Sequence, residues 1–132
     1  MPYLHLNLLA EPSTEVATKA AEVLTRLTAE LLGKKPDLTA VAVTTMPRER
    51  WYIGAQVVPP GQSAFYLDIK VTEGTNTKNE KARYVQAVFE SMASLLGELA
   101  PASYVVIHEV HADAWGYSGK TQEFRYVRGK SL

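Results

Sequence analysis

The sequence predicts an α+β fold in which two β-α-β repeats form a four-stranded mixed sheet with two helices on one face. Three observations lead to this prediction. An alternating apolar segment at 3–7, YLHLN, returns at 66–70 as YLDIK, and such alternation is typical of strands. A segment with helical apolar spacing follows each copy. A β-branched strand then follows each helix, and this order predicts a parallel strand pair with a right-handed crossover.

Length and composition predict one soluble domain. The 132 residues are 46% hydrophobic, which is enough for a proper core, so we expect a single domain over residues 1–132. We divide it into repeat 1 at 2–58, a linker at 59–63 and repeat 2 at 64–127. Fourteen Lys and Arg residues balance fourteen Asp and Glu residues, and no basic stripe indicates nucleic acid as a partner.

The residue types exclude several kinds of site. The chain has no cysteine, which excludes disulfides, thiolate metal sites and a cysteine nucleophile. Its three scattered histidines give no zinc pattern, and we expect neither a metal nor another cofactor. The longest uncharged stretch, 51–67, is interrupted by Pro-Pro-Gly and is not expected to span a membrane. No signal-peptide pattern opens the sequence, so we expect a cytoplasmic protein.

The first repeat opens with Pro2 directly before a strand whose alternate leucines share one face. Proline is well tolerated there, because the missing N–H costs nothing at the first residue of a strand. Ser13 or Thr14 can cap the helix that follows, which ends at Leu32-Gly33. The remaining predicted elements are a strand over 39–45, a turn with Trp and Gly over 50–55, and a short strand over 56–58.

The second repeat has the same order of elements. Thr77 and Glu80, three residues later, predict a capping box at the start of its helix, which ends at Gly97. The apolar stripe of this helix is expected to comprise Ala82, Val85, Val88, Phe89, Met92 and Leu96. A strand over 103–110, a turn with Trp and Gly over 114–120, and a short strand over 122–127 complete the repeat.

The two helices cover only one face of the predicted sheet. The sequence holds no further layer for the other face, and the apolar residues of the second strands need burial. We therefore expect self-association, with sheets from several subunits packed together.

The opening MPYLHLNLLA, the doubled β-α-β order and the turn MPRERWYIG at 46–54 together resemble the tautomerase superfamily. The first half is most similar to a 4-oxalocrotonate tautomerase subunit. The second half is similar to the same unit without its leading proline, because Phe65 stands where Pro2 stands in the first. One chain with two such halves is the layout of macrophage migration inhibitory factor, malonate semialdehyde decarboxylase and the fused tautomerases. The resemblance implies a homotrimer.

The resemblance gives Pro2 a chemical role. Removal of Met1 would leave a secondary amine at the chain terminus, and an apolar pocket near cations would lower its pKa. Pro2 would then act as a general base that isomerises a 2-oxo or 2-hydroxy-enoic acid without a cofactor. The alternatives are a lyase of the same superfamily, either a decarboxylase or a hydratase, and a non-catalytic trimeric interaction module if Met1 is retained.

The resemblance also implies residues that bind a small carboxylate-bearing substrate. The arginines of the 4-oxalocrotonate tautomerase pattern align with Pro12 and Ala40, so both are missing. Lys34, in the run Gly-Lys-Lys-Pro, is the expected replacement, although a lysine here could merely complement the end of the helix. Tyr104 would donate a hydrogen bond to an enolate oxygen, or would be an ordinary strand tyrosine.

Three further residues are candidates for the site. Asp37 aligns with an aspartate of malonate semialdehyde decarboxylase, and otherwise would be a turn residue after Pro36. Trp51 and Trp115 are expected to form pocket walls, to anchor their hairpins by burial, or both. The missing cation could also come from an arginine near a turn or subunit edge, namely Arg48, Arg50 or Arg125.

Overall fold

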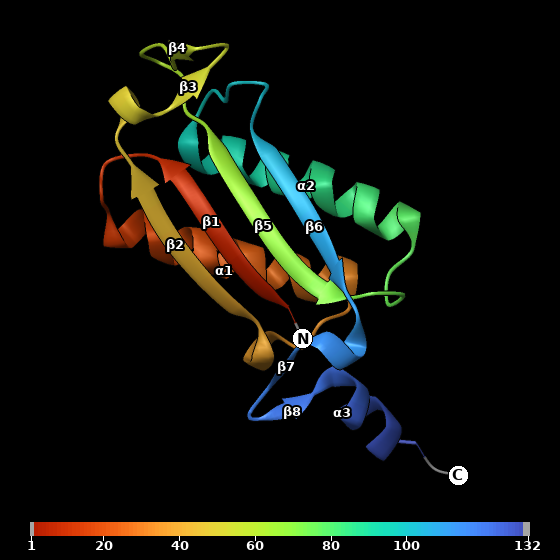
Figure 1. Cartoon of the computed structure of the whole chain (residues 1–132). Helices are drawn as coiled ribbons and strands as arrows, with labels where there is room; N and C mark the ends of the chain where they lie inside the picture. The colour runs from red at the N-terminus through yellow and green to blue at the C-terminus, as the bar shows by residue number, and fades with distance from the viewer. Residues whose placement is uncertain (1, 131–132) are drawn as a thin grey trace.

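A computed structural model describes residues 2–130 of the chain. It contains the expected four-stranded mixed sheet with two long helices on one face (Figure 1). The strands lie in the order β2-β1-β5-β6, with β1 parallel to β2, β5 parallel to β6, and β1 antiparallel to β5. The main elements are β1 (Tyr3–Leu9), α1 (Thr14–Leu32), β2 (Ala40–Met46), β5 (Phe65–Thr72), α2 (Lys78–Leu96) and β6 (Tyr104–Val110).

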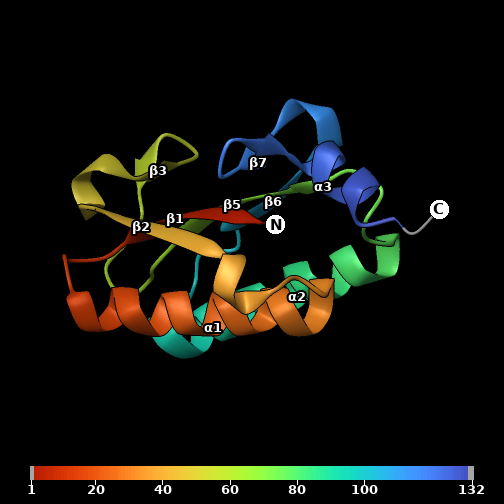
Figure 2. The same cartoon turned by 90° about the horizontal axis from the view of Figure 1, so that it is seen from below.

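Short elements join and extend these. A hairpin follows β2 and a second hairpin follows β6, and Figure 2 shows both on the side of the sheet opposite the long helices. The short elements are η1 (Pro36–Leu38), η2 (Arg48–Arg50), β3 (Tyr52–Ile53), β4 (Gln56–Val57), η3 (Ala112–Ala114), β7 (Gly116–Tyr117), β8 (Lys120–Thr121) and α3 (Gln122–Arg128).

The strand register gives the sheet two distinct ends. Tyr3 pairs with Lys70, so β1 starts beside the end of β5. Leu8 pairs with Phe65, so β5 starts beside the end of β1. We call the first the Pro2 end and the second the Phe65 end. Because the two repeats run in opposite directions, Pro2 and Phe65 lie at opposite ends although they occupy equivalent positions in the two repeats.

The core lies between the sheet and the long helices. Leucines of β1 and apolar residues of β5 are fully buried there against both helices. Thr28 and Tyr84 join the two helices inside this core, with their hydroxyl groups 2.9 Å apart. Burial raises the pKa of Tyr84 to about 12, because the ionised phenolate is poorly solvated there.

The buried face of α2 differs from the expected stripe. Val88 and Met92 are buried as expected, but Tyr84 is buried with them, while Ala82 is exposed and Val85 is 39% exposed. A tyrosine can enter a core when its hydroxyl finds a partner. Thr28 provides that partner. The buried face of α2 therefore includes Tyr84 and is shifted away from the expected stripe.

The predicted strand over 122–127 is wrong, because this segment is the helix α3. The Thr121 side chain accepts a hydrogen bond from the backbone N–H of Phe124, which caps the helix start. The strand before it, β8, is only two residues long, so the hairpin ends where the cap begins. The equivalent prediction in the first repeat, 56–58, corresponds to β4.

The second face of the sheet carries polar pairs beside apolar side chains. The Nε2 atom of His108 lies 2.6 Å from Oδ1 of Asp68. The Nε2 atom of His5 lies 3.1 Å from Oγ1 of Thr44, which also contacts Asn7. Among the apolar residues of β2 and β6, Val41, Val43, Val105 and Ile107 pack against the core, whereas Tyr104 and Val106 line a cavity on the second face. Within residues 2–130, no helix combines the length and apolar character needed to cross a membrane.

Candidate active site

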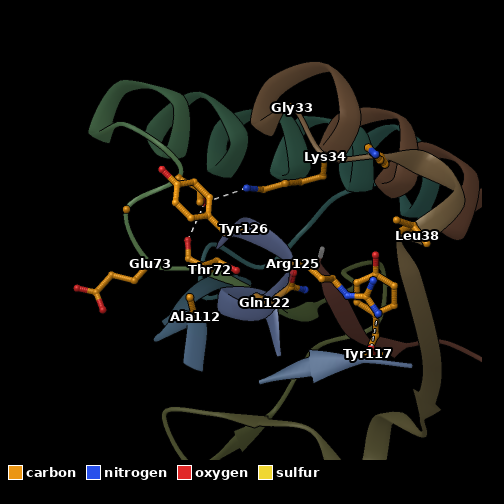
Figure 3. A pocket seen from close by; sticks show the side chains of 13 residues that line it. Gly33, Lys34, Leu38, Thr72, Glu73, Ala112, Tyr117, Gln122, Arg125 and Tyr126 are labelled. Carbon is orange, nitrogen blue, oxygen red and sulfur yellow. Dashed lines mark hydrogen bonds between the residues drawn. The ribbon is translucent and has the colours of Figure 1, made fainter. Parts of the chain in front are cut away.

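A cavity of about 630 Å³ lies at the Pro2 end of the sheet (Figure 3). Its wall combines the end of α1, the turn after β5, the start of η3, the second hairpin and α3. The lining residues are Gly33, Lys34, Lys35, Leu38, Thr72, Glu73, Gly74, Thr75, Ala112, Tyr117, Gln122, Arg125 and Tyr126.

Pro2 is buried beside this cavity. Its carbonyl oxygen accepts a hydrogen bond of 3.4 Å from the backbone N–H of Ala40, and Leu38, two residues before Ala40, lines the cavity. On the other side, Thr72 at the end of β5 also lines it. Pro2 is not itself among the described residues that line the cavity. Figures 1 and 2 both show the start of β1 next to the second hairpin.

Lys34 enters the cavity because of the way α1 ends. Gly33 adopts the left-handed conformation, with φ 70°, and its N–H and that of Lys34 bond back to carbonyl groups of α1. The Lys34 Nζ atom donates a hydrogen bond of 2.9 Å to Oγ1 of Thr75. Burial lowers the pKa of Lys34, while the charge of Glu80 partly opposes this shift.

Trp115 and Asp37 also lie at the Pro2 end. The Nε1 atom of Trp115 donates a hydrogen bond of 3.1 Å to Oγ1 of Thr72, which anchors the second hairpin to the end of β5. Asp37 is exposed on η1. Its neighbours Lys35 and Leu38 line the cavity, but Asp37 is not among the described residues that do.

Trp51 and Tyr104 lie at the Phe65 end. They line a second cavity of about 580 Å³ whose wall is largely aromatic. Tyr104 pairs with Tyr66, and Tyr66 with Asn7, which is five residues along β1 from Pro2. At about 3.3 Å per residue this is roughly 16 Å. One chain therefore does not bring Trp51 or Tyr104 to Pro2.

The three candidate arginines have different surroundings. Nη1 of Arg48 donates to three backbone carbonyl groups, at 2.8–3.1 Å, so its role is to hold the linker. Arg50 lines a shallow cavity with Trp51 at the Phe65 end. Arg125 is the arginine that lines the cavity at the Pro2 end.

Sequence reasoning missed several lining residues, chiefly Gln122, Tyr117 and the threonines of the β5 turn. A signal for Gln122 was present. Thr121 followed by Glu123, with Arg128 in the last turn, matches the pattern of a short helix with favourable charges at both ends. Among residues 2–130, no group of His, Asp or Glu side chains is arranged to hold a metal ion.

Comparison with known proteins agrees with this geometry. A family model described as tautomerase enzyme matches residues 66–125, which run from β5 into α3, and the same fold over nearly the whole chain recurs in solved tautomerase structures. The similarity to the tautomerase family model therefore covers the second half of the chain. No curated protein matches the sequence.

Three solved structures share the fold of this chain. A fused 4-OT wild-type asymmetric trimer is 17% identical with a TM-score of 0.81, and the match covers 97% of this chain and 99% of that one. A macrophage migration inhibitory factor-like protein from Entamoeba histolytica is 21% identical with a TM-score of 0.76, covering 91% and 97%. A member of the cis-3-chloroacrylic acid dehalogenase family is 15% identical with a TM-score of 0.78, covering 98% and 92%. At these identities, the likeness concerns the fold alone.

Proposed function

We propose that this protein is a member of the tautomerase superfamily and a cofactor-independent tautomerase that isomerises a 2-oxo or 2-hydroxy-enoic acid, with Pro2 as the general base. The observation that carries the proposal is the burial of Pro2 at the start of β1, beside a cavity that holds Lys34. The proposal requires removal of Met1, which lies outside the described residues.

The chemistry follows from the nature of the proline nitrogen. Bonded to Met1 it is an amide and cannot take a proton. As the chain terminus it is an amine, for which the ordinary pKa is about 8, and burial favours its neutral form. The neutral amine would take a proton from the enol hydroxyl or from the α-carbon and return it to another carbon. Such general base catalysis contributes about 10²–10⁴ in rate.

The substrate carboxylate would be held by a cation at the same end of the sheet. Lys34 and Arg125 are both available in the cavity wall. A lyase reaction assisted by Asp37 has less support, because Asp37 is exposed outside the lining of the cavity.

A homotrimer would complete the site. The aromatic cavity with Trp51 and Tyr104 lies at the far end of the same chain, and Tyr104 is 59% exposed. In a closed ring, the Phe65 end of one subunit would meet the Pro2 end of the next. Tyr104 could then donate a hydrogen bond to the enolate formed at a neighbour's Pro2. A fused 4-OT of the same fold forms a trimer.

Two measurements test the proposed function. Intact mass should show a chain that lacks Met1. Pro2→Ala should lower kcat/KM on phenylenolpyruvate or 2-hydroxymuconate by about 10²-fold or more, while the control Pro12→Ala, at an exposed position, should leave it unchanged. A retained Met1, or full turnover by Pro2→Ala, would refute the role of Pro2.

A further inference from the structure

Two side-chain donors of α3 are buried at the cavity without a partner. The Nε atom of Arg125 and the Nε2 atom of Gln122 are both shielded from solvent, and neither has a hydrogen-bond partner among residues 2–130. Both residues line the cavity (Figure 3). They are three positions apart on α3 and so lie on one side of the helix. An unsatisfied buried donor is costly, and an acceptor atom that reached these two donors would remove that cost.

Arg125 is held in a fixed orientation. Its Nη2 atom donates a hydrogen bond of 2.8 Å to the carbonyl oxygen of Tyr117. The guanidinium carbon lies 3.7 Å from the centre of the Tyr117 ring, a cation–π contact. A guanidinium has five N–H groups in one plane, and these contacts leave the Nε–H unused.

The charges of the cavity wall favour an anion. Lys34, Lys35 and Arg125 line the cavity, against one carboxylate, that of Glu73. The Oε2 atom of Glu73 lies 2.8 Å from Nδ1 of His111, so Glu73 already has a partner. The Glu80 carboxylate acts on Lys34 from the start of α2 and is itself held by the helix cap.

We infer that Arg125 and Gln122 bind the carboxylate of the substrate. This inference rests on the proposed function and deepens it, because it places the carboxylate on α3 of the same chain. A planar guanidinium and an amide N–H together match the two oxygens of one carboxylate. Lys34, on the α1 side of the cavity, then faces the 2-oxo oxygen, where negative charge develops.

The other residues that line the cavity indicate which substituent the substrate carries besides its carboxylate. Leu38, Ala112 and the ring of Tyr126 line the same cavity. Such a surface suits an apolar or aromatic group. The substrate class is therefore a 2-oxo acid with one carboxylate and an apolar or aromatic substituent.

A pair of ligands tests this without requiring turnover. Phenylpyruvate and phenylacetone share the phenyl ring and the ketone, but only phenylpyruvate has a carboxylate. Calorimetric titration of the full chain should show that phenylpyruvate binds more tightly. Arg125→Gln should weaken phenylpyruvate binding by about 10- to 100-fold and leave phenylacetone binding unchanged. Gln122→Leu should weaken phenylpyruvate binding severalfold.

Matched variants separate recognition from a structural role of Arg125. Arg128→Gln removes the same charge from an exposed position of α3 and should change neither affinity. Arg125→Lys keeps the charge without the planar fork, and should recover part of the phenylpyruvate affinity. If Arg125 only holds α3 in place, Arg125→Gln will weaken the binding of both ligands equally. That result would overturn the inference.

The outcomes also distinguish this inference from the proposed function. No binding of phenylpyruvate by the unmodified protein, or no loss in Arg125→Gln, overturns the carboxylate site. Carboxylate-selective binding through Arg125 without any turnover supports the carboxylate site and counts against Pro2 catalysis. Turnover that survives Arg125→Gln with an unchanged KM supports the proposed function and overturns the inference.

Discussion

At the scale of single residues, the contact between Thr28 and Tyr84 has a defined direction. The Thr28 hydroxyl donates a hydrogen bond of 2.7 Å to the carbonyl oxygen of Leu24. A hydroxyl has one proton to donate. Tyr84 must therefore donate to Thr28. Removing the Thr28 hydroxyl and removing the Tyr84 hydroxyl should for that reason have different effects on stability.

Thr28→Val should destabilise the protein more than Tyr84→Phe. The valine leaves the Tyr84 hydroxyl buried without a partner, at a cost of about 1–3 kcal/mol. The phenylalanine leaves Thr28 bonded to Leu24 and costs about 0.5–1.5 kcal/mol. Urea unfolding of the two variants measures the difference. A larger loss in Tyr84→Phe would contradict the assigned direction.

At the scale of elements, the start of α2 and the end of α1 are joined at the cavity. The Asn76 side chain donates to the carbonyl oxygen of Leu32 at 3.0 Å and to Glu80 at 3.3 Å. Glu80 in turn accepts from the backbone N–H of Thr77. The capping box of one helix therefore sets the charge near the last residues of the other, where Lys34 lies.

Glu80→Gln should lower the pKa of Lys34 further. Burial already lowers this pKa from 10.5, and the Glu80 charge acts in the opposite direction. Glutamine keeps an oxygen for the cap but removes the charge, so Lys34 should lose its proton at a lower pH than in the unmodified protein. Titration of the lysine side chains by NMR with ¹³C labelling measures the shift.

Glu90→Gln is the matched control for that titration. Glu90 is an exposed residue of the same helix, so its replacement should leave the Lys34 titration where it is. A Lys34 pKa that rises or stays constant in Glu80→Gln would show that Glu80 does not support the charge of Lys34.

The long elements could be predicted from sequence, whereas the short helix α3 could not. The nineteen residues of α1 or α2 contain several repeats of the apolar periodicity, so each helix can be predicted together with its caps. The seven residues of α3 are too few for this periodicity to repeat. Their β-branched and aromatic residues favoured the prediction of a strand. Tyr84 was missed because its burial depends on Thr28, a partner on another helix.

The candidate site could be predicted only in part for a similar reason. Lys34 was predicted from the resemblance that its run Gly-Lys-Lys-Pro carries. The separation of Tyr104 from Pro2 could not be found, because it depends on the antiparallel pairing of β1 with β5. That pairing is a contact between distant segments and leaves no local pattern in the sequence.

At the scale of the whole molecule, the proposed sharing of a site between subunits predicts that two defective chains complement each other. In a mixed trimer, Pro2 of a Tyr104→Phe chain can meet Tyr104 of a Pro2→Ala chain. Each variant alone should have low activity, and a refolded mixture should recover part of it. Light scattering should give a mass three times the 14.6 kDa of one chain.

Homogeneous refolded samples of each variant are the controls for the mixture. If no activity returns although mixed trimers form, each site draws its Pro2 and Tyr104 from one chain or does not use Tyr104. A monomeric protein in solution would contradict the shared site directly.

Phe65 is fully buried at the position that Pro2 holds in the other repeat, and its backbone N–H bonds to Oγ of Ser103. An interior position can never become a free amine, whatever residue occupies it. Two repeats in one polypeptide therefore share a single position at which a proline can become an N-terminal amine. Under the proposed function, repeat 2 needs no proline at this position, so the residues at the Phe65 end can differ from those around Pro2.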